Sequence, residues 1–540
     1  MLLELCGGSV YITNLYLAAL RPRLFPGAAD GEALMEYLVF ASNLGNWVPL
    51  AGFLYDARRG GPRTVVFAGA ALTLLGYGGL WLCSAFDVHA NFAVLWLLWF
   101  LWGHGSGYFD CAAIATCSAN FRESRGLVLG LTKSFYGLSG SLLTQVFLAF
   151  FAAPDAAPAF LLFLGVALCL LALALAPLVR RLAPPRPLDA DSPSRRFARG
   201  YALVGALAVA MVAISLLRAF SPLAASRAFS LGALGLVAAS LLALPSLAWG
   251  AAAAAGSPSV GSSSVAGRVG LLEEADAAAA RRESGAGPTQ HAQHAPQGPP
   301  LQLSPPPDGQ QPGSGVWASV ASVDFGLLFV AAFAGWGGGI VLLNHIGKIV
   351  TAAAPAQASS QASPILVSLL SACNCIGRMA AGACSDALSR RRVPRPHLLA
   401  AATCLMGAAH AALLGAASPP LLYLGAAAGG AAYGAVWSLL PSIVGDIFPA
   451  RHFATVYNLF SLAASSSSLL LSTLLATKVY AAHAHVTTPG AAAECHGSLC
   501  YRATHLAILG ACAAGTAGAL ALGVRNRAIY RGKLLDRAAV

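Results

Sequence analysis

Long apolar stretches separated by short polar ones run through most of this chain. A helix that crosses the hydrocarbon core of a bilayer needs about 20 mostly apolar residues. Fourteen stretches qualify or nearly qualify, which predicts an all-α polytopic membrane protein. The first has no room for a leading turn, because it begins at Met1. The stretches are approximately 2–20, 34–55, 64–85, 91–117, 126–151, 158–179, 201–217, 229–249, 325–344, 364–384, 398–416, 420–441, 453–477 and 504–524.

The segment from about Gly256 to Gly315 breaks this pattern. It is rich in Ser, Gly, Gln and Pro and has few apolar side chains. Such a segment buries too little apolar surface to offset the entropy lost on folding. We therefore expect a disordered loop with one short helix near Leu271–Arg282.

The composition agrees with a membrane protein and excludes a water-soluble enzyme. Of the 540 residues, 57% are hydrophobic and only 10% are charged, whereas soluble domains carry roughly a quarter charged residues. The chain opens in an apolar helix that contains Glu4 and no basic segment, so we expect no cleavable signal peptide.

Basic residues are concentrated in alternate loops. Cytoplasmic loops of membrane proteins carry the excess of Lys and Arg, so the asymmetry places both termini and the long loop in the cytoplasm. The net charge of +12 does not indicate a nucleic-acid partner, because no basic face is interleaved with aromatic residues. The richer side holds Arg58, Arg59, Arg63, Arg122, Arg125, Arg180, Arg181, Arg195, Arg196, Arg390, Arg391, Arg392, Arg395, Arg525, Arg527, Arg531 and Lys533.

Most of the 12 cysteines lie inside apolar stretches, where a thiol behaves as a small hydrophobic group. Cys495 and Cys500 differ, because they share a polar loop expected on the non-cytoplasmic side, where thiols can oxidise. Gly497 allows the tight turn that a disulfide between them needs. Two free thiols, or a metal contact assisted by His496, are the alternatives. The sequence shows no metal-ligand or catalytic-triad pattern and indicates no cofactor.

One loop pattern occurs twice, at the step from the second to the third stretch of each half. A glycine precedes an aspartate by four residues, and arginines follow. Glycine permits close helix contact, while aspartate at the membrane edge can pair with arginine or cap a helix. Such links can break and reform during alternating access; the alternative is an ordinary cytoplasmic helix end. The residues are Gly52, Asp56, Arg58 and Arg59, and then Gly382, Asp386, Arg390 and Arg391.

Few charges lie inside the apolar stretches, and we take Asp110, Lys133 and Arg378, together with Tyr136, as a candidate substrate or proton site. A charge at the centre of a bilayer costs roughly 2.5–3.5 kcal/mol or more. Asp110 lies roughly 18 Å above Arg122 and Lys133 roughly 12 Å above Arg125, so the two can meet between antiparallel helices. A structural ion pair is the alternative. Arg378, near a helix end, is expected to snorkel or pair with a loop rather than bind substrate.

Two further features suggest packing or anchoring more than chemistry. Gly335 and Gly337–Gly339 form a run in the middle of a stretch, which favours close helix packing or a breakable helix over a nucleotide loop. Asn344, His345 and Lys348 are expected to anchor the outer end of the same helix.

The repeated loop resembles the signature loop of the major facilitator superfamily, and longer motifs are similar to the nodulin-like family of plants and algae. The similarity extends over residues 1–250 and 320–531. Asp110 stands where members of that family often carry Asn, so its charge need not be a family requirement. Members also have more apolar sequence before Cys-Gly-Gly, which implies a truncated first helix here. The motifs are Cys6–Gly8, Tyr108–Gly126, Lys133–Gln145, Asp446–Asn458 and Cys495–Thr504.

The resemblance implies two six-helix bundles with two additional helices between them. The expected domains are an N-terminal bundle at 1–181, two linking helices at 182–250, the loop at 251–320, a C-terminal bundle at 321–524 and a basic cytoplasmic tail at 525–540.

We therefore expect a secondary transporter that moves a small solute, an organic anion in view of Lys133 and Arg378, by alternating access. The alternative is a membrane receptor that keeps the fold, transports nothing and signals through the 256–315 loop. An integral-membrane enzyme is disfavoured, because no His, Asp or Glu cluster stands in the membrane-edge loops. The expected partners are the solute and the bilayer of the plasma membrane or an endomembrane, with a monomer as the functional unit.

Overall fold

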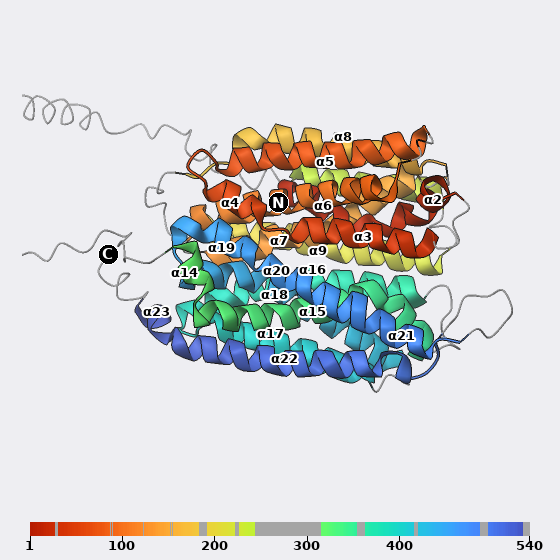
Figure 1. Ribbon diagram of the computed structural model, residues 1–540. Coiled ribbons are helices and arrows are strands. Elements are labelled where there is room, and N and C mark those ends of the chain that lie inside the picture. Colours follow the sequence, from red (N-terminus) through yellow and green to blue (C-terminus); the bar gives the residue numbers. More distant parts are fainter. Residues whose placement is uncertain are drawn as a thin grey trace, which may run out of the picture. The chain divides into compact units, whose positions relative to one another are not determined.

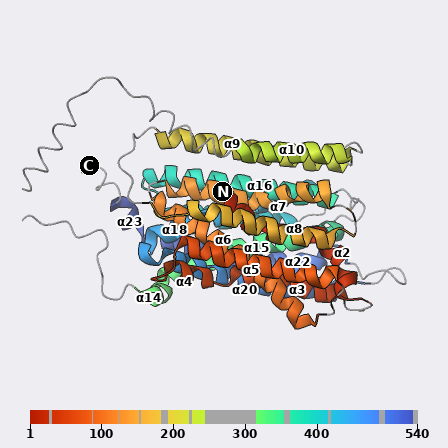
Figure 2. The same cartoon turned by 90° about the horizontal axis from the view of Figure 1, so that it is seen from above.

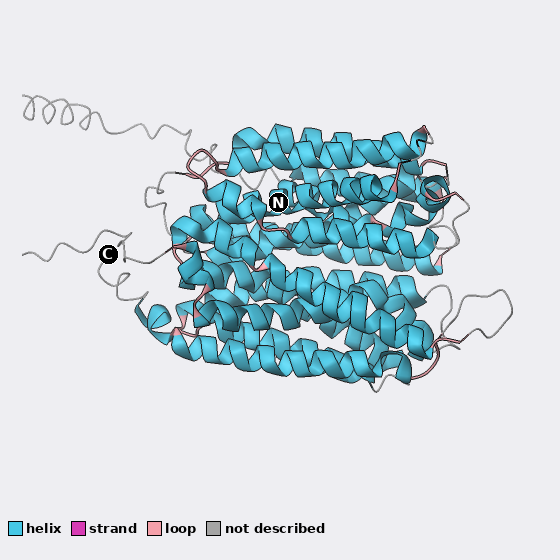
Figure 3. Cartoon of the chain, in the orientation of Figure 1, coloured by secondary structure: helices cyan, strands magenta, loops and turns pink. Residues whose placement is uncertain are grey.

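The computed structural model describes residues 1–26, 31–86, 88, 90–122, 124–151, 153, 155–182, 192–221, 226–243, 315–353, 362–414, 419–485 and 495–532. The helix expected at 271–282, most of the predicted loop and the last residues of the predicted tail lie outside these ranges. All described helices belong to one compact unit. The described part of this unit consists of helices joined by loops (Figures 1 and 3).

The helices of the first half follow the predicted stretches closely. They are α1 (Leu2–Gly7), η1 (Gly8–Ile12), α2 (Asn14–Leu24), α3 (Gly31–Trp47), α4 (Leu50–Asp56), α5 (Pro62–Ala85), α6 (Phe92–Asn120), α7 (Arg125–Phe150), α8 (Ala157–Leu175), η2 (Ala176–Leu178), α9 (Ser192–Phe220) and α10 (Arg227–Ala243).

The second half begins with the short helix α14 and ends with α23. Its helices are α14 (Val316–Val320), α15 (Val323–Ala353), α16 (Ala362–Arg390), α17 (Arg395–Leu414), α18 (Pro419–Ile447), η5 (Ala450–His452), α19 (Phe453–Leu459), α20 (Ser461–Ser467), η6 (Ser468–Ala476), α21 (Thr477–His483), α22 (Leu499–Arg525) and α23 (Arg527–Gly532).

Many of these helices have the length and the surface of membrane spans. Eight helices in the described ranges are long and apolar enough to cross a bilayer. Their outer faces carry exposed apolar side chains, such as Leu75, Leu170 and Val209, that water would not favour. The protein is thus an integral, multi-pass membrane protein.

Three predicted stretches are not single regular helices. The first passes through the 3₁₀ turn η1, because Gly7 and Gly8 bring the chain against α6 and α7. The second is interrupted at Val48 and Pro49, since proline cannot donate the helical hydrogen bond. The thirteenth is divided into α19, α20, the π-helical η6 and α21. The predicted loop also ends earlier than expected, because α14 lies inside its last residues.

Helices from the two halves of the sequence pack directly on each other. α7 contacts α16 and α18, α4 contacts α19, and α3 contacts α20. α9 and α10 lie along the outside, against α7 and α16 (Figure 2). The glycine run of α15 is continuous helix, and Gly335 and Gly339 pack closely on Val436 and Tyr433. The contacts agree with the expected close packing, and the expected breakable helix stays a prediction.

Candidate functional site

A small cavity lies between helices of both halves. Its volume is about 30 Å³, far below the roughly 150 Å³ of a cavity that binds benzene. In this conformation it is therefore too small for an organic solute. Its polar wall includes Asn46, Asp110, Lys133, Tyr136, Arg378 and Tyr457, so the structure brings together all four predicted site residues.

Lys133 and Asp110 form an ion pair between α7 and α6. The Lys133 side chain is 2% exposed, and its ammonium lies over the ring of Trp437 at 4.8 Å and those of Tyr136 and Tyr457 at 5.5 and 5.6 Å. Aromatic faces attract a cation that has lost its water. The Tyr457 hydroxyl donates to Asp110 Oδ2 at 2.9 Å. The pair is thus held in one place by groups from both halves.

Arg378 is 1% exposed and does not snorkel, because α16 continues for three more turns to Arg390 and leaves it inside the protein. Its guanidinium donates to Asn374 Oδ1 at 2.9 Å, to the Lys133 carbonyl at 2.8 Å and to the Tyr11 hydroxyl at 3.4 Å. No carboxylate in the described ranges forms an ion pair with it. The expectation of a snorkelling arginine is wrong.

Ionic links close one end of the unit, which we call the basic end (Figure 1, left). Asp386, at the end of the repeated pattern on α16, accepts hydrogen bonds from the backbone N–H groups of Gly126 and Leu127 at 2.9 and 2.8 Å. These donors are at the start of α7, where an acceptor is favourable. Arg395 bridges Asp386 at 2.5 Å and Asp446 at 2.7 Å, and Asp446 also pairs with Arg125 at 3.2 Å.

Asp56 makes the corresponding link in the first copy of the pattern. It accepts a hydrogen bond from the backbone N–H of Thr455 at 2.8 Å, at the start of α19. Arg181 lies 3.7 Å from the other carboxylate oxygen but is half exposed, so this pair is weak. Burial raises the pKa of Asp56, and the hydrogen bonds from Thr455 and the charge of Arg181 oppose that rise.

The glycines of both patterns lie where backbones meet. A Cβ on Gly52 would lie 2.4 Å from the Ala454 carbonyl oxygen, and one on Gly382 would lie 2.4 Å from the Gly126 carbonyl oxygen. The predicted arginines act differently from the glycines and aspartates. Arg58, Arg59, Arg390 and Arg391 are exposed, and in the described part of the chain the two carboxylates pair with Arg181 and Arg395 instead.

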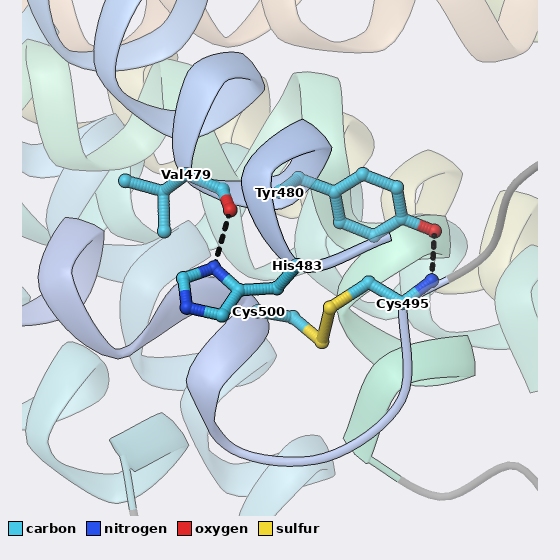
Figure 4. The surroundings of a disulfide bond; sticks show 5 residues. All are labelled: Val479, Tyr480, His483, Cys495 and Cys500. Carbon is cyan, nitrogen blue, oxygen red and sulfur yellow. Dashed lines mark hydrogen bonds between the residues drawn. A yellow bond between two sulfur atoms is a disulfide. The ribbon is translucent and has the colours of Figure 1, made fainter. Parts of the chain in front are cut away.

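At the other end, Cys495 and Cys500 form a disulfide with their Cα atoms 5.9 Å apart (Figure 4). The Cys495 N–H donates to the Tyr480 hydroxyl at 3.3 Å, and the Gly497 N–H donates to the Ala352 carbonyl at 2.7 Å. The turn at Gly497 has φ of 99°, which favours glycine. The disulfide loop therefore joins the start of α22 to the end of α15.

Of the polar residues near the end of α15, His345 faces inward, whereas Asn344 and Lys348 are exposed. His345 is 8% exposed and hydrogen-bonds to the Ser472 hydroxyl at 3.1 Å, and Asn344 donates to the same hydroxyl at 3.0 Å. These contacts join α15 to η6, so His345 and Asn344 hold two helices together. Within the described ranges, no group of three His, Cys, Asp or Glu residues could hold a metal ion.

Comparisons with known proteins give the family. A model described as "Nodulin-like" matches residues 1–248, and a model of the NFD4 C-terminal domain matches residues 312–531. The chain belongs to the nodulin-like family. Protein NUCLEAR FUSION DEFECTIVE 4 of Arabidopsis thaliana is 30% identical over 139 residues, which are 25% of this chain and 23% of that protein.

Solved structures show that this nodulin-like protein has the fold of the major facilitator superfamily. A proton:xylose symporter of that superfamily, bound to 6-bromo-6-deoxy-D-glucose, superposes with a TM-score of 0.54 at 13% identity, over 96% of this chain and 92% of that one. A bacterial homologue of the iron transporter ferroportin, in an outward-facing state, gives 0.53 at 11% identity, over 96% and 97%.

Sequence reasoning missed several residues of the site in this nodulin-like protein. The sequence suggested only a family motif for Asp446 and only a loop cation for Arg395. In the structure the two form an ion pair at the centre of the basic end. Trp437 and Tyr457 look like ordinary core aromatics, because only the fold places them around the Lys133 ammonium.

Proposed function

We propose that this nodulin-like protein is a secondary transporter for a small solute with an anionic group. One observation carries the proposal: Arg378 is buried in the cavity wall without a carboxylate partner among the described residues. Lys133 is already balanced by Asp110. An anionic group that entered the cavity would meet the positive charge of Arg378, whose hydrogen-bond acceptors among the described residues are all neutral.

We propose alternating access by two six-helix bundles, with α9 and α10 as the additional pair and fourteen crossings in all. Both links at the basic end join the first half of the sequence to the second, through Asp56 with Thr455 and Asp386 with Gly126. A cavity of about 30 Å³ admits a solute only after the links at one end release. The proposed gating residues are therefore the two aspartates, the two glycines and Arg395.

We further propose that the basic end faces the cytoplasm, with both termini and the loop at 251–320, and that the disulfide lies on the other side of the membrane. The excess of arginine at the basic end supports this orientation. The exposed Arg58, Arg59, Arg390 and Arg391 then serve orientation rather than gating. We infer a monomeric transporter without enzyme activity or cofactor.

Uptake into proteoliposomes tests this function. The probes are labelled malate, citrate, gluconate and inorganic phosphate, with labelled sorbitol as an uncharged comparison. We expect uptake of at least one anion and none of sorbitol, and Arg378→Gln should abolish it. The matched control is Arg390→Gln, because Arg390 is exposed.

Uptake of sorbitol that survives Arg378→Gln would contradict an anion site. Anions that raise the melting temperature without entering the vesicles would instead favour the receptor function, because binding to the native state stabilises a protein whether or not it transports.

A further inference from the structure

Helix α9 lies along the line where the two halves of the sequence meet. It packs against α7 of the first half and α16 of the second, on the outside of the unit (Figure 2). Near its middle, a Cβ on Gly205 would lie 3.7 Å from Met379 Cε of α16. The proposed transport cycle gives α9 no task beyond completing the number of crossings, yet its contacts reach the second copy of the glycine–aspartate pattern.

At the basic end, the backbones of α7 and α16 cross in close contact. A Cβ on Gly382 would overlap the Gly126 carbonyl oxygen and lie 2.7 Å from the Gly130 Cα. Glycines permit helix backbones to approach this closely. The crossing stands directly beside the hydrogen bonds of Asp386 to Gly126 and Leu127. It must therefore separate when the basic end opens.

Tyr201 of α9 reaches into this crossing. Its hydroxyl donates to the Leu127 carbonyl of α7 at 3.0 Å. A Cβ on Gly130 would lie 2.8 Å from the Tyr201 hydroxyl oxygen, and one on Gly382 would lie 3.1 Å from it. The hydroxyl has room only because α7 and α16 each carry a glycine here. Tyr201 therefore contacts both halves of the sequence at the point where they cross.

Other residues fix α9 to the first half. The ring of Phe197 packs edge-on against Phe121, directly after the end of α6, with 5.8 Å between the ring centroids. A Cβ on Gly200 would lie 2.8 Å from Leu131 Cδ2 of α7. The part of α9 before Tyr201 is thus anchored on α6 and α7, and this anchoring directs the Tyr201 hydroxyl to the crossing with α16.

The hydrogen bond of Tyr201 contributes differently to the two states of the basic end. A hydrogen bond is stronger where water is kept away. In the closed state the hydroxyl lies against the backbones of both α7 and α16. When α16 moves away, water reaches the hydroxyl and replaces the bond at little cost. The contact therefore stabilises the closed state more than the open state.

We propose that α9 is a brace that stabilises the closed basic end, with Tyr201 as its positioning residue. The additional helix then has a conformational role, because it sets how often the basic end opens. This inference rests on the opening of the basic end in the proposed transport cycle, and its test needs no substrate.

Labelling of a buried cysteine with a water-soluble maleimide measures this opening in the full-length protein. Ser385→Cys supplies the reporter, because Ser385 is 0% exposed and lies at the crossing. Peptide-resolved mass spectrometry separates it from the native cysteines. Tyr201→Phe removes only the hydroxyl. A hydrogen bond of ordinary strength corresponds to about a 2- to 12-fold change in an equilibrium constant, so the reporter should label faster by about this factor.

Two controls separate the brace from a general loosening of the protein. Tyr37→Phe removes the same hydroxyl from a side chain that is 58% exposed, and it should leave labelling unchanged. Val350→Cys is a second reporter, buried near the end of α15 at the other end of the unit. It should label at the same rate with and without Tyr201→Phe. Acceleration at both reporters would mean general loosening and would overturn the brace.

The outcomes also separate the brace from transport. Equal labelling of the Ser385→Cys reporter in Tyr201→Phe, Tyr37→Phe and the wild type overturns the brace, even if the wild type takes up an anion. Faster labelling of Tyr201→Phe in a protein that takes up none of the four anions supports the brace and contradicts the proposed function. If the Ser385→Cys reporter already labels at the maximal rate in the wild type, Ala454→Cys, at a buried position of the first copy, replaces it with the same expectations.

Discussion

Asp56 and Thr455 are joined by a hydrogen bond of 2.8 Å between a carboxylate and a backbone N–H, although 399 positions separate them. Asp386 binds the N–H of Gly126 in the same manner at 2.9 Å. In both cases a glycine four residues earlier lets the two backbones meet. The same arrangement of glycine and aspartate thus occurs twice. Each copy joins the end of one helix to the beginning of a helix from the other half of the sequence.

The two glycines should be the most sensitive positions of this arrangement. Gly52→Ala and Gly382→Ala should each separate the backbones at the basic end, at a cost of about 1–3 kcal/mol, because the new Cβ meets a carbonyl oxygen. Labelling of an introduced cysteine at the basic end should become faster. Gly78→Ala is the matched control, because no atom lies near its Cβ position. Equal labelling in all three variants would contradict the close-contact role.

The two aspartates should differ when each is changed to asparagine. Asp386 accepts two backbone hydrogen bonds and pairs with the buried Arg395. Asp386→Asn should lower uptake at least tenfold, because a buried charge loses its partner at a cost of several kcal/mol. Asp56→Asn should cost less than threefold, since asparagine can still accept from Thr455 and Arg181 is half exposed. The measurement is the initial rate of uptake at equal protein density; an equal loss in both would contradict this ranking.

The pKa of Asp56 gives a pH dependence with a definite sign. Burial raises it in this conformation, whereas a conformation with Asp56 in water would have the ordinary value. The closed basic end therefore binds the proton more tightly, and lowering the pH through the raised pKa should favour closure. Cysteine labelling at the basic end should slow as the pH falls. Asp56→Asn should remove that part of the pH dependence; acceleration at low pH in the wild type would show that the sign is wrong.

The ion pair of Asp110 and Lys133 should show strong coupling in a double-mutant cycle. Asp110→Asn and Lys133→Met should each cost about 3–5 kcal/mol, because each leaves one buried charge without a partner. The double variant should be more stable than either single variant. Thermal unfolding in detergent measures stability, and uptake measures function. Additive losses of stability would show that the two side chains act independently.

The disulfide should contribute modestly to stability, and it should be present in protein prepared without reductant. A ring this short contributes about 2 kcal/mol, so Cys495→Ser with Cys500→Ser should lower the melting temperature by a few degrees. Mass spectrometry after alkylation without reduction should find both cysteines unlabelled. Cys404 is the internal control, because it is a free and exposed thiol. Rapid labelling of Cys495 and Cys500 would also contradict the proposed orientation.

Hydropathy alone located most helices, because long apolar runs have few alternatives to a membrane crossing. It did not locate the interruptions. The stretch at 34–55 is apolar throughout, yet the chain breaks at Val48 and Pro49, and only the proline was visible in advance. The π-helical turn at Ser468–Ala476 has no comparable sign in a run of serine and leucine.

The sequence identified site residues that are isolated charges in apolar stretches. It did not identify their contact partners that lie far away along the chain. Asp110, Lys133 and Arg378 stand out because a charge in an apolar stretch is costly. The length of α16 could not be inferred from hydropathy, since its last turns are polar, and this placed Arg378 wrongly at a helix end. Arg395 lies 9 positions from its partner Asp386. Tyr457 lies 347 positions from its partner Asp110, so this contact could be found only from the fold.

Helix α7 carries parts of both the basic end and the cavity. Arg125 and the N–H groups of Gly126 and Leu127 belong to the ionic links, while the Lys133 side chain and carbonyl belong to the cavity. About 12 Å of continuous helix separates Arg125 from Lys133. A rotation of α7 that breaks the links must displace the Lys133 ammonium as well. In the proposed transport cycle, release of the ionic links and movement of the Lys133 ammonium would therefore occur in one step. Opening the basic end without disturbing the cavity would require α7 itself to bend.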